Sequence, residues 1–285
     1  MLFLFNAIAL ISLIFASLTD IKTREVPDWL NYGLIIFGLF SRLIYSFVLS
    51  DFSFFFYGLA GFFVFFIIGN LMFYSAQWGG GDSKLLMGLG ALIGLNPNFT
   101  EIPFIFMFFI NIMIVGAFYG LFWSFLLAIK NWKKFSRDFT IRLKEKTRIR
   151  AIVIILCLLI LSSSFFINKN FLRMMVVSLA VFTFLIFYLS LFIKSIEKTC
   201  MLKYVNPEQL TEGDWIAKDV IVNKKRIAGP KDLGIEKKQI NKLIEFKRKG
   251  LVKKILIKEG IPFVPSFLIA YILTLFVGNW VFLFI

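Results

Sequence analysis

Residues 54–95 read FFFYGLAGFFVFFIIGNLMFYSAQWGGGDSKLLMGLGALIGL. The part that ends at Trp78 is apolar and long enough to cross a bilayer as one helix, which takes about 20 residues. Residues 85–95 are apolar but too short to cross alone. The polar turn GGGDSK, residues 79–84, separates the two. We therefore expect a transmembrane helix, a turn at a membrane face, and then either a half-membrane helix or a helix that extends over the turn.

The same alternation of apolar runs and short polar turns extends along the whole chain, which is 59% hydrophobic. No soluble domain of this length needs so many apolar residues. The sequence predicts an all-α polytopic membrane protein with about eight transmembrane or half-membrane helices. The expected segments are 2–19, 29–49, 54–78, 85–95, 103–129, 151–167, 171–193 and 263–285.

Five regions follow from this pattern. They are a membrane core at 1–129, a basic cytoplasmic loop at 130–150, an extra transmembrane hairpin at 151–193, a small soluble α+β cytoplasmic insert at 194–260, and a last helix at 261–285. Within the insert, hydrophobic periodicity predicts strands over 214–222 and 251–258 and a helix over 235–249.

The positive charge is concentrated in two of these regions. Residues 130–150 carry nine Lys and Arg against two acids, and residues 194–260 carry seventeen against nine. Both blocks adjoin membrane segments, so the positive-inside rule and contact with anionic membrane lipid explain them better than nucleic-acid binding does. We therefore expect both blocks, loop 20–28 and the glycine turn on the cytoplasmic side, with the N-terminus outside.

The residue types that are missing restrict the chemistry. The chain has no His, which excludes His-based general bases, His metal ligands and Ser-His-Asp triads. The two cysteines, Cys157 and Cys200, are too far apart in sequence to suggest a metal cluster or a disulfide framework. Any catalysis must use carboxylates, Lys, Tyr, Ser or Thr.

Two aspartates at the edges of membrane segments are the main candidates for catalysis. Ionisable residues next to or inside membrane segments are costly and tend to be functional or paired. Asp20 closes the first segment and Asp82 follows three glycines. Asp20 could simply cap a helix end, and Asp82 could be the N-cap of the short fourth segment. Two carboxylates at one site could instead share a proton and activate a water molecule, one as the base and the other as the acid.

Three motifs resemble the type IV prepilin peptidases, a family of GxGD membrane aspartyl proteases. Residues 19–28, TDIKTREVPD, resemble the family's first-aspartate loop, residues 79–86, GGGDSKLL, its second-aspartate motif, and residues 261–265, IPFVP, the start of its last helix. The longer run from Gly79 is most similar to the archaeal preflagellin (archaellin) and prepilin peptidases. The resemblance is good over 1–129 and 261–285, and poor across the hairpin and the insert.

This resemblance implies an aspartic endopeptidase with Asp20 and Asp82 as its catalytic pair and with no metal or organic cofactor. The implied substrate is a pilin-like or archaellin precursor, whose short basic class III leader is cut at the cytoplasmic membrane face. Methyl transfer is not expected, because the Cys-rich domain of the bacterial enzymes is missing. The motif residues that would support the site are Gly79, Gly80, Gly81, Lys84, Pro262 and Pro265.

Three charged residues near the aspartates have open roles. Lys84 either biases the sharing of the proton or extends to lipid headgroups. Glu25 and Asp28 either bind basic side chains of a leader or pair locally with Lys22 and Arg24. The sequence leaves open the oligomeric state and the identity of the precursor.

Two other functions are compatible with parts of the sequence. A transporter or a pilus-assembly factor would need polar groups near mid-membrane, and Asn70 and Asn111 are the main ones, although each could equally join two helices. A presenilin-like protease would cut inside transmembrane helices. That family has a Pro-Ala-Leu element where this chain has residues 262–265, PFVP, and Asp20 lies at a helix end rather than deep in a helix. Both features disfavour the presenilin-like reading.

Overall fold

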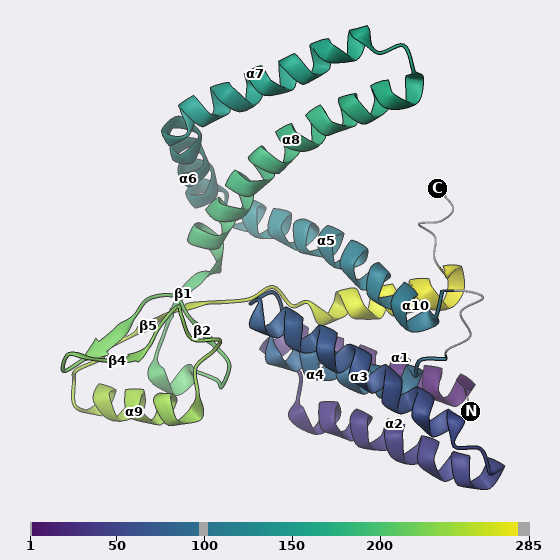
Figure 1. Cartoon of the computed structure of the whole chain (residues 1–285). Coiled ribbons are helices and arrows are strands. Elements are labelled where there is room, and N and C mark those ends of the chain that lie inside the picture. Colours follow the sequence, from purple (N-terminus) through teal and green to yellow (C-terminus); the bar gives the residue numbers. More distant parts are fainter. Residues whose placement is uncertain (1, 97–101, 279–285) are drawn as a thin grey trace. The chain divides into compact units, whose positions relative to one another are not determined.

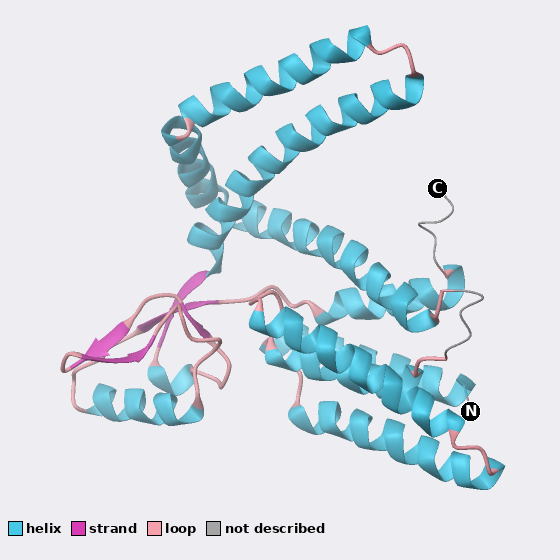
Figure 2. Cartoon of the chain, viewed as in Figure 1, coloured by secondary structure: helices cyan, strands magenta, loops and turns pink. Residues whose placement is uncertain are grey.

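The computed structural model describes residues 2–96 and 102–278, and its regular structure is mostly helical (Figures 1 and 2). Within these residues, six helices are long and apolar enough to cross a membrane, which confirms the predicted all-α polytopic fold. Their spans are Phe3–Thr23, Asp28–Leu49, Ser53–Tyr74, Phe104–Lys130, Thr147–Phe166 and Asn170–Met201.

The chain divides into two compact units, and the first contains both aspartate motifs. Its apolar helices are α1 (Leu2–Thr23), α2 (Asp28–Leu49), α3 (Ser53–Tyr74), α4 (Gly80–Ile93), α5 (Phe104–Lys130) as far as residue 122, and α10 (Val264–Val277). Residues 205–255 of the insert also belong to this unit. One buried apolar core joins these helices. At its centre the ring of Phe108 from α5 meets that of Tyr271 from α10 edge-on at 5.2 Å, and the Tyr271 hydroxyl donates to Asn6 Oδ1 of α1 at 2.9 Å.

Helix α4 is short and closely packed between α2 and α3. A Cβ atom placed on Gly90 would lie 2.4 Å from the carbonyl oxygen of Gly61 in α3, and one on Gly88 would lie 2.8 Å from Cβ of Leu34 in α2. Small residues allow helix backbones to approach this closely inside a membrane. With 14 residues, α4 is about 21 Å long, too short to cross alone. It begins at Gly80, so the short fourth segment extends over the glycine turn.

The second unit contains residues 123–204 and 256–259. Its elements are the end of α5, α6 (Trp132–Glu145), α7 (Thr147–Ser163), the 3₁₀ turn η1 (Ser164–Phe166), α8 (Asn170–Ile196), the π-helical turn η2 (Glu197–Met201), β1 (Leu202–Val205) and β5 (Ile255–Lys258). Helices α7 and α8 form the expected hairpin, and the buried Cys157 thiol donates to the Ala180 carbonyl oxygen between them at 3.5 Å.

The basic segment 130–150 differs from the expected loop, because most of it is helical. Phe135 and Phe139 of α6 lie one turn apart on the same face and pack against the ends of α5 and α8. On the same helix Asp138 is buried and pairs with Arg142 at 2.6 Å and with Lys198 at 2.8 Å. The density of charge suggested a loop, but the spacing of these aromatic residues specifies an amphipathic helix.

The insert contains the expected mixture of strands and a helix, although its boundaries differ (Figure 2). Helix α8 and turn η2 extend to Met201, so the first strand, β1, starts only at Leu202. The strand expected over 214–222 is divided into two, and an unexpected strand pairs with the second of them in an antiparallel hairpin. The remaining elements are η3 (Pro207–Gln209), β2 (Trp215–Ile216), β3 (Val220–Val222), β4 (Lys225–Ala228) and α9 (Lys237–Arg248).

The last apolar segment is described only in part. Helix α10 runs from Val264 to Val277, and residues 279–285 of the expected segment lie outside the described residues. Near its end, the Asn111 amide of α5 donates to the Thr274 hydroxyl of α10 at 2.9 Å. This bond fixes α10 against α5 within the first unit.

Candidate active site

Asp20 lies in the last turn of α1 and is only 5% exposed. One carboxylate oxygen, Oδ2, accepts a hydrogen bond from the backbone N–H of Val264 at 2.9 Å. Val264 is the first residue of α10, and the N–H groups of a helix's first turn have no partner within the helix. A carboxylate is also favoured at the positive end of a helix dipole. The end of α1 and the start of α10 therefore meet at Asp20.

Asp82 is the third residue of α4 rather than its N-cap, which is Gly79. Its Oδ2 atom reaches back and accepts a hydrogen bond from the Gly79 backbone N–H at 3.2 Å. The alternative that Asp82 is merely the N-cap of the fourth segment is therefore wrong. Like an N-cap side chain, the Asp82 carboxylate accepts a backbone hydrogen bond at the start of α4, but it projects from within the first helical turn.

The two aspartates influence each other electrostatically. Burial first, and then the negative charge of Asp20, raise the pKa of Asp82 to about 7 from its ordinary value of 3.8. The hydrogen bond from Gly79 opposes part of this rise. Since like charges held close together do not both ionise readily, the charge of Asp20 favours the protonated form of Asp82.

The Pro-Phe-x-Pro segment contacts both aspartate motifs. Val264 donates to Asp20, while the ring of the preceding Phe263 lies 5.8 Å from that of Trp78, the residue before the three glycines. Trp78 is buried and also contacts the Phe267 ring at 5.1 Å. On α5, a Cβ atom on Gly116 would lie 2.5 Å from Phe263 Cζ, so a larger residue would displace this ring.

Trp78 and Gly116 were missed by sequence reasoning. Neither has an ionisable or nucleophilic group, so neither gave a chemical signal. The position of Trp78 next to the glycine turn was the one clue in the sequence. Pro262 and Pro265 flank the start of α10, where Pro265 suits the first helical turn because it needs no N–H partner there.

Lys84 forms an ion pair that the sequence did not predict. Its ammonium group pairs with the Asp28 carboxylate at 2.7 Å and lies 5.3 Å from the centre of the Tyr32 ring. Asp28 is thus engaged with Lys84, rather than with Lys22 or Arg24. The pair links the start of α2 to the first turn of α4. Glu25, the other acid proposed for leader binding, is exposed.

The glycines of the turn are less crowded than their number suggests. A Cβ atom on Gly81 would lie at ordinary contact distance, 3.4 Å, from Cβ of Val26, and one on Gly80 would lie 3.6 Å from the Phe73 ring. The Asn31 side chain of α2 donates to the Gly81 carbonyl oxygen at 3.4 Å. A closer contact lies further along α4, at Gly90.

Two further polar residues surround Asp20. Arg24 adopts a left-handed backbone conformation with φ of 63°, and its N–H donates to the Asp20 carbonyl oxygen at 2.9 Å. Such a conformation is uncommon for a residue with a side chain, and here it follows the end of α1 at Thr23, one helical turn after Asp20. The Arg24 side chain and Tyr119 of α5 both lie within electrostatic range of the Asp20 carboxylate.

The polar residues that suggested a transporter are engaged in helix contacts. Asn111 bonds to Thr274, as described above, and Asn70 donates to the carbonyl oxygen of Phe66 in its own helix at 2.8 Å.

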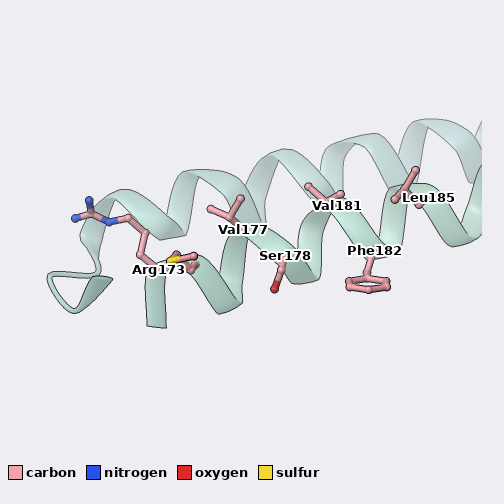
Figure 3. Close-up of a pocket in the computed structure, with 7 residues that line it drawn as sticks. Arg173, Val177, Ser178, Val181, Phe182 and Leu185 are labelled. Atoms are coloured by element: carbon pink, nitrogen blue, oxygen red, sulfur yellow. The ribbon is translucent and has the colours of Figure 1, made fainter. Parts of the chain in front are cut away.

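A shallow groove runs along α8 in the second unit, and its side chains differ from those of the aspartate site. Figure 3 shows its side chains, which are apolar apart from Arg173 and Ser178. The lining therefore contains no carboxylate, unlike the aspartate site.

Comparison with known proteins agrees with the motifs. Residues 7–121 match the type IV leader peptidase family. A preflagellin peptidase of Methanococcus maripaludis is 35% identical over 136 residues, which are 44% of this chain and 57% of that protein. Preflagellin peptidases of Methanococcus voltae and Methanocaldococcus jannaschii are 42% and 43% identical over 30% and 29% of this chain.

The chain spans little more than half of the first relative's length, and 37% and 35% of the lengths of the other two. The family match covers α1 to α4 and most of α5, and so includes both Asp20 and Asp82. It stops before the α7–α8 hairpin and the insert, where the sequence resemblance was poor. The membrane segment 7–121, with its two aspartate motifs, is therefore similar to the type IV leader peptidase family.

Proposed function

We propose that this protein is a membrane aspartyl endopeptidase that removes the short basic leader from pilin-like or archaellin precursors. The observation that carries this proposal is the electrostatic coupling of Asp20 and Asp82, which come from different helices. The match of segment 7–121 to the type IV leader peptidase family supports the peptidase class, and the names of the preflagellin peptidases to which the chain is similar support the substrate class.

In the proposed reaction, a water molecule attacks the carbonyl carbon of the scissile peptide bond. The ionised aspartate accepts a proton from the water, and the protonated aspartate donates its proton to the carbonyl oxygen. The tetrahedral intermediate then collapses and the carbon–nitrogen bond breaks. The leaving amine takes the proton that the base aspartate accepted from the water, and the other aspartate regains a proton from a hydroxyl group of the intermediate. We assign the initial proton to Asp82, whose pKa is about 7, and the base role to Asp20.

The orientation and the leader-binding surface are part of the same proposal. The basic blocks at 130–150 and 194–260 support a cytoplasmic location for the ends of α5 and α8 and for the insert. With the N-terminus outside, the end of α1 and the start of α4 lie on that same face. Because Asp28 pairs with Lys84, we propose Glu25 as the acid that attracts basic leader side chains.

Cleavage of a synthetic precursor peptide by the purified, lipid-reconstituted protein tests the mechanism. The peptide carries a short basic leader followed by an apolar helix. We expect Asp20→Asn and Asp82→Asn each to lower the cleavage rate by about 100-fold to 10,000-fold, the usual contribution of a general acid or base. Asp51→Asn is the matched control, because Asp51 is exposed and its carboxylate accepts hydrogen bonds from Ser53 between α2 and α3.

Two outcomes would count against the proposal. Near-normal cleavage by a folded Asp20→Asn or Asp82→Asn variant would contradict the two-carboxylate mechanism. A folded wild-type protein that cuts no precursor peptide, but transports ions, would favour the transporter alternative.

A further inference from the structure

Arg42 is a buried cation in the middle of a membrane-spanning helix, α2, and is only 2% exposed. Its guanidinium group donates to three successive carbonyl oxygens at the end of α4. Nε bonds to Ala91 at 3.0 Å, and Nη2 bonds to Leu92 at 2.7 Å and to Ile93 at 2.9 Å. A fourth bond, from Nη1, reaches the Phe54 carbonyl oxygen of α3 at 3.0 Å.

These contacts satisfy a need that arises from the shortness of α4. The last four carbonyl groups of any helix have no partner within that helix. In a membrane interior water is scarce, and an unsatisfied carbonyl there costs several kcal/mol. The C-terminal end of a helix also carries a partial negative charge, which favours a cation. Arginine, with five donors in a planar fork, can serve several carbonyls at once.

The surroundings of Arg42 are shaped to hold its side chain. The guanidinium carbon lies 4.4 Å from the centre of the Phe54 ring and 5.1 Å from that of Phe5. A Cβ atom on Gly58 would lie 2.3 Å from Arg42 Cδ, and one on Gly94 would lie 2.7 Å from Nη2. Both glycines therefore leave the space that the arginine fills.

We propose that Arg42 is a positioning residue, which fixes α4 along its axis and thereby sets the position of Asp82. Asp82 and Ile93 belong to the same unbroken helix, roughly 16 Å apart along its axis at 1.5 Å per residue. A shift at the capped end therefore moves the carboxylate at the other end. The catalytic consequence rests on the proposed function, whereas the structural consequence can be tested without it.

A disulfide trap measures the position of α4 directly. The ideal Cβ of Gly81 lies 3.4 Å from Cβ of Val26, close to the spacing of about 3.5–4.5 Å that a disulfide requires. The trap is Val26→Cys with Gly81→Cys, in a chain that also carries Cys157→Ser and Cys200→Ser. We expect rapid oxidation when Arg42 is present, and severalfold slower oxidation with Arg42→Met. Arg42→Lys, which keeps the charge but not the fork, should be intermediate.

The matched control is Arg142→Met, the same chemical change in the second unit. Arg142 pairs with Asp138 on α6, so its loss should lower the melting temperature without slowing oxidation of the trap. If Arg42→Met does not accumulate as folded protein, Gly58→Ala provides an independent perturbation. It keeps the arginine but crowds its side chain, and it should also slow the oxidation.

Kinetics in the chain with its native glycines supply the second measurement. We expect Arg42→Met to lower kcat by about 10-fold to 100-fold with KM nearly unchanged, because misplacement by about 1 Å can have this effect. The positioning role would be overturned if a folded Arg42→Met protein oxidised the trap as fast as wild type and also kept the wild-type kcat. If the wild-type protein cuts no precursor, the proposed function fails, while the trap still decides the role of Arg42.

Discussion

The membrane core and the α7–α8 hairpin are both built from apolar helices, but they are packed very differently. In the most apolar window of α1, 39% of the residues are buried within the protein, against 11% in α7 and in α8. Buried polar groups of the core are tied across helices, as at Asp20, Arg42 and Asn111. The comparison teaches that apolar composition places a helix in lipid, whereas glycines and paired polar groups fix its position against other helices.

The largest expected effect concerns the pH dependence of cleavage, which only the core should control. As the pH rises through about 7, the aspartate pair loses its shared proton, and the rate should then fall about tenfold per pH unit. At pH 9 we expect a rate about 100-fold below its maximum. Phe182→Ala, on the exposed surface of the hairpin, should leave the pH–rate profile unchanged.

Stability provides a second readout of the same titration. Because the pKa of Asp82 in the folded protein lies above its ordinary value, its contribution to stability is complete at low pH and is lost as the pH rises through about 7. Asp82→Asn cannot ionise. The melting temperature of Asp82→Asn minus that of wild type should therefore be larger at pH 8 than at pH 5. An equal difference at the two pH values would contradict the raised pKa of Asp82.

A smaller effect should come from crowding the glycine contact of α4. Gly90→Ala would place a methyl group 2.4 Å from the Gly61 carbonyl oxygen, and we expect a loss of about 1–3 kcal/mol in the free energy of unfolding. Thermal or denaturant unfolding of the reconstituted protein measures this change.

Gly120→Ala in α5 is the control for that prediction, because a Cβ atom there would meet nothing within 4 Å. Gly120→Ala should change the free energy of unfolding by less than about 1 kcal/mol. Phe182→Ala tests the hairpin in the same way and should also be mild. A large loss of stability in Phe182→Ala would mean that the outer face of the hairpin is covered by protein rather than by lipid.

The smallest expected effect concerns Glu25. An exposed ion pair contributes about 0.2–1 kcal/mol, so Glu25→Gln should raise KM for a basic leader by no more than about fivefold and leave kcat unchanged. The effect should shrink as salt is added. Glu212→Gln, at an exposed acid of the insert, is the control and should leave KM as in wild type. An equal change in both variants would remove the proposed role of Glu25.

The apolar segments and both aspartates could be predicted because each follows from local sequence. The partners of charged groups could not be predicted in this way. Residues 20–28 offer three acids to Lys84, and only the packing of α2 on α4 selects Asp28. Arg42 was overlooked, although a cation within an apolar segment is a signal that sequence alone can give. Helix α6 was missed because its basic composition obscured the spacing of Phe135 and Phe139.

The hydrogen bond from Val264 to Asp20 joins positions that are 244 residues apart. During synthesis on the ribosome, the second partner therefore emerges long after the first helix has entered the bilayer. Until α10 is inserted, the Asp20 carboxylate lacks this donor, and the rings of Phe263 and Phe267 that cover Trp78 are missing as well. The hydrogen bond to Asp20 and the aromatic cover of Trp78 would thus be completed only late in synthesis, when α10 docks against α1.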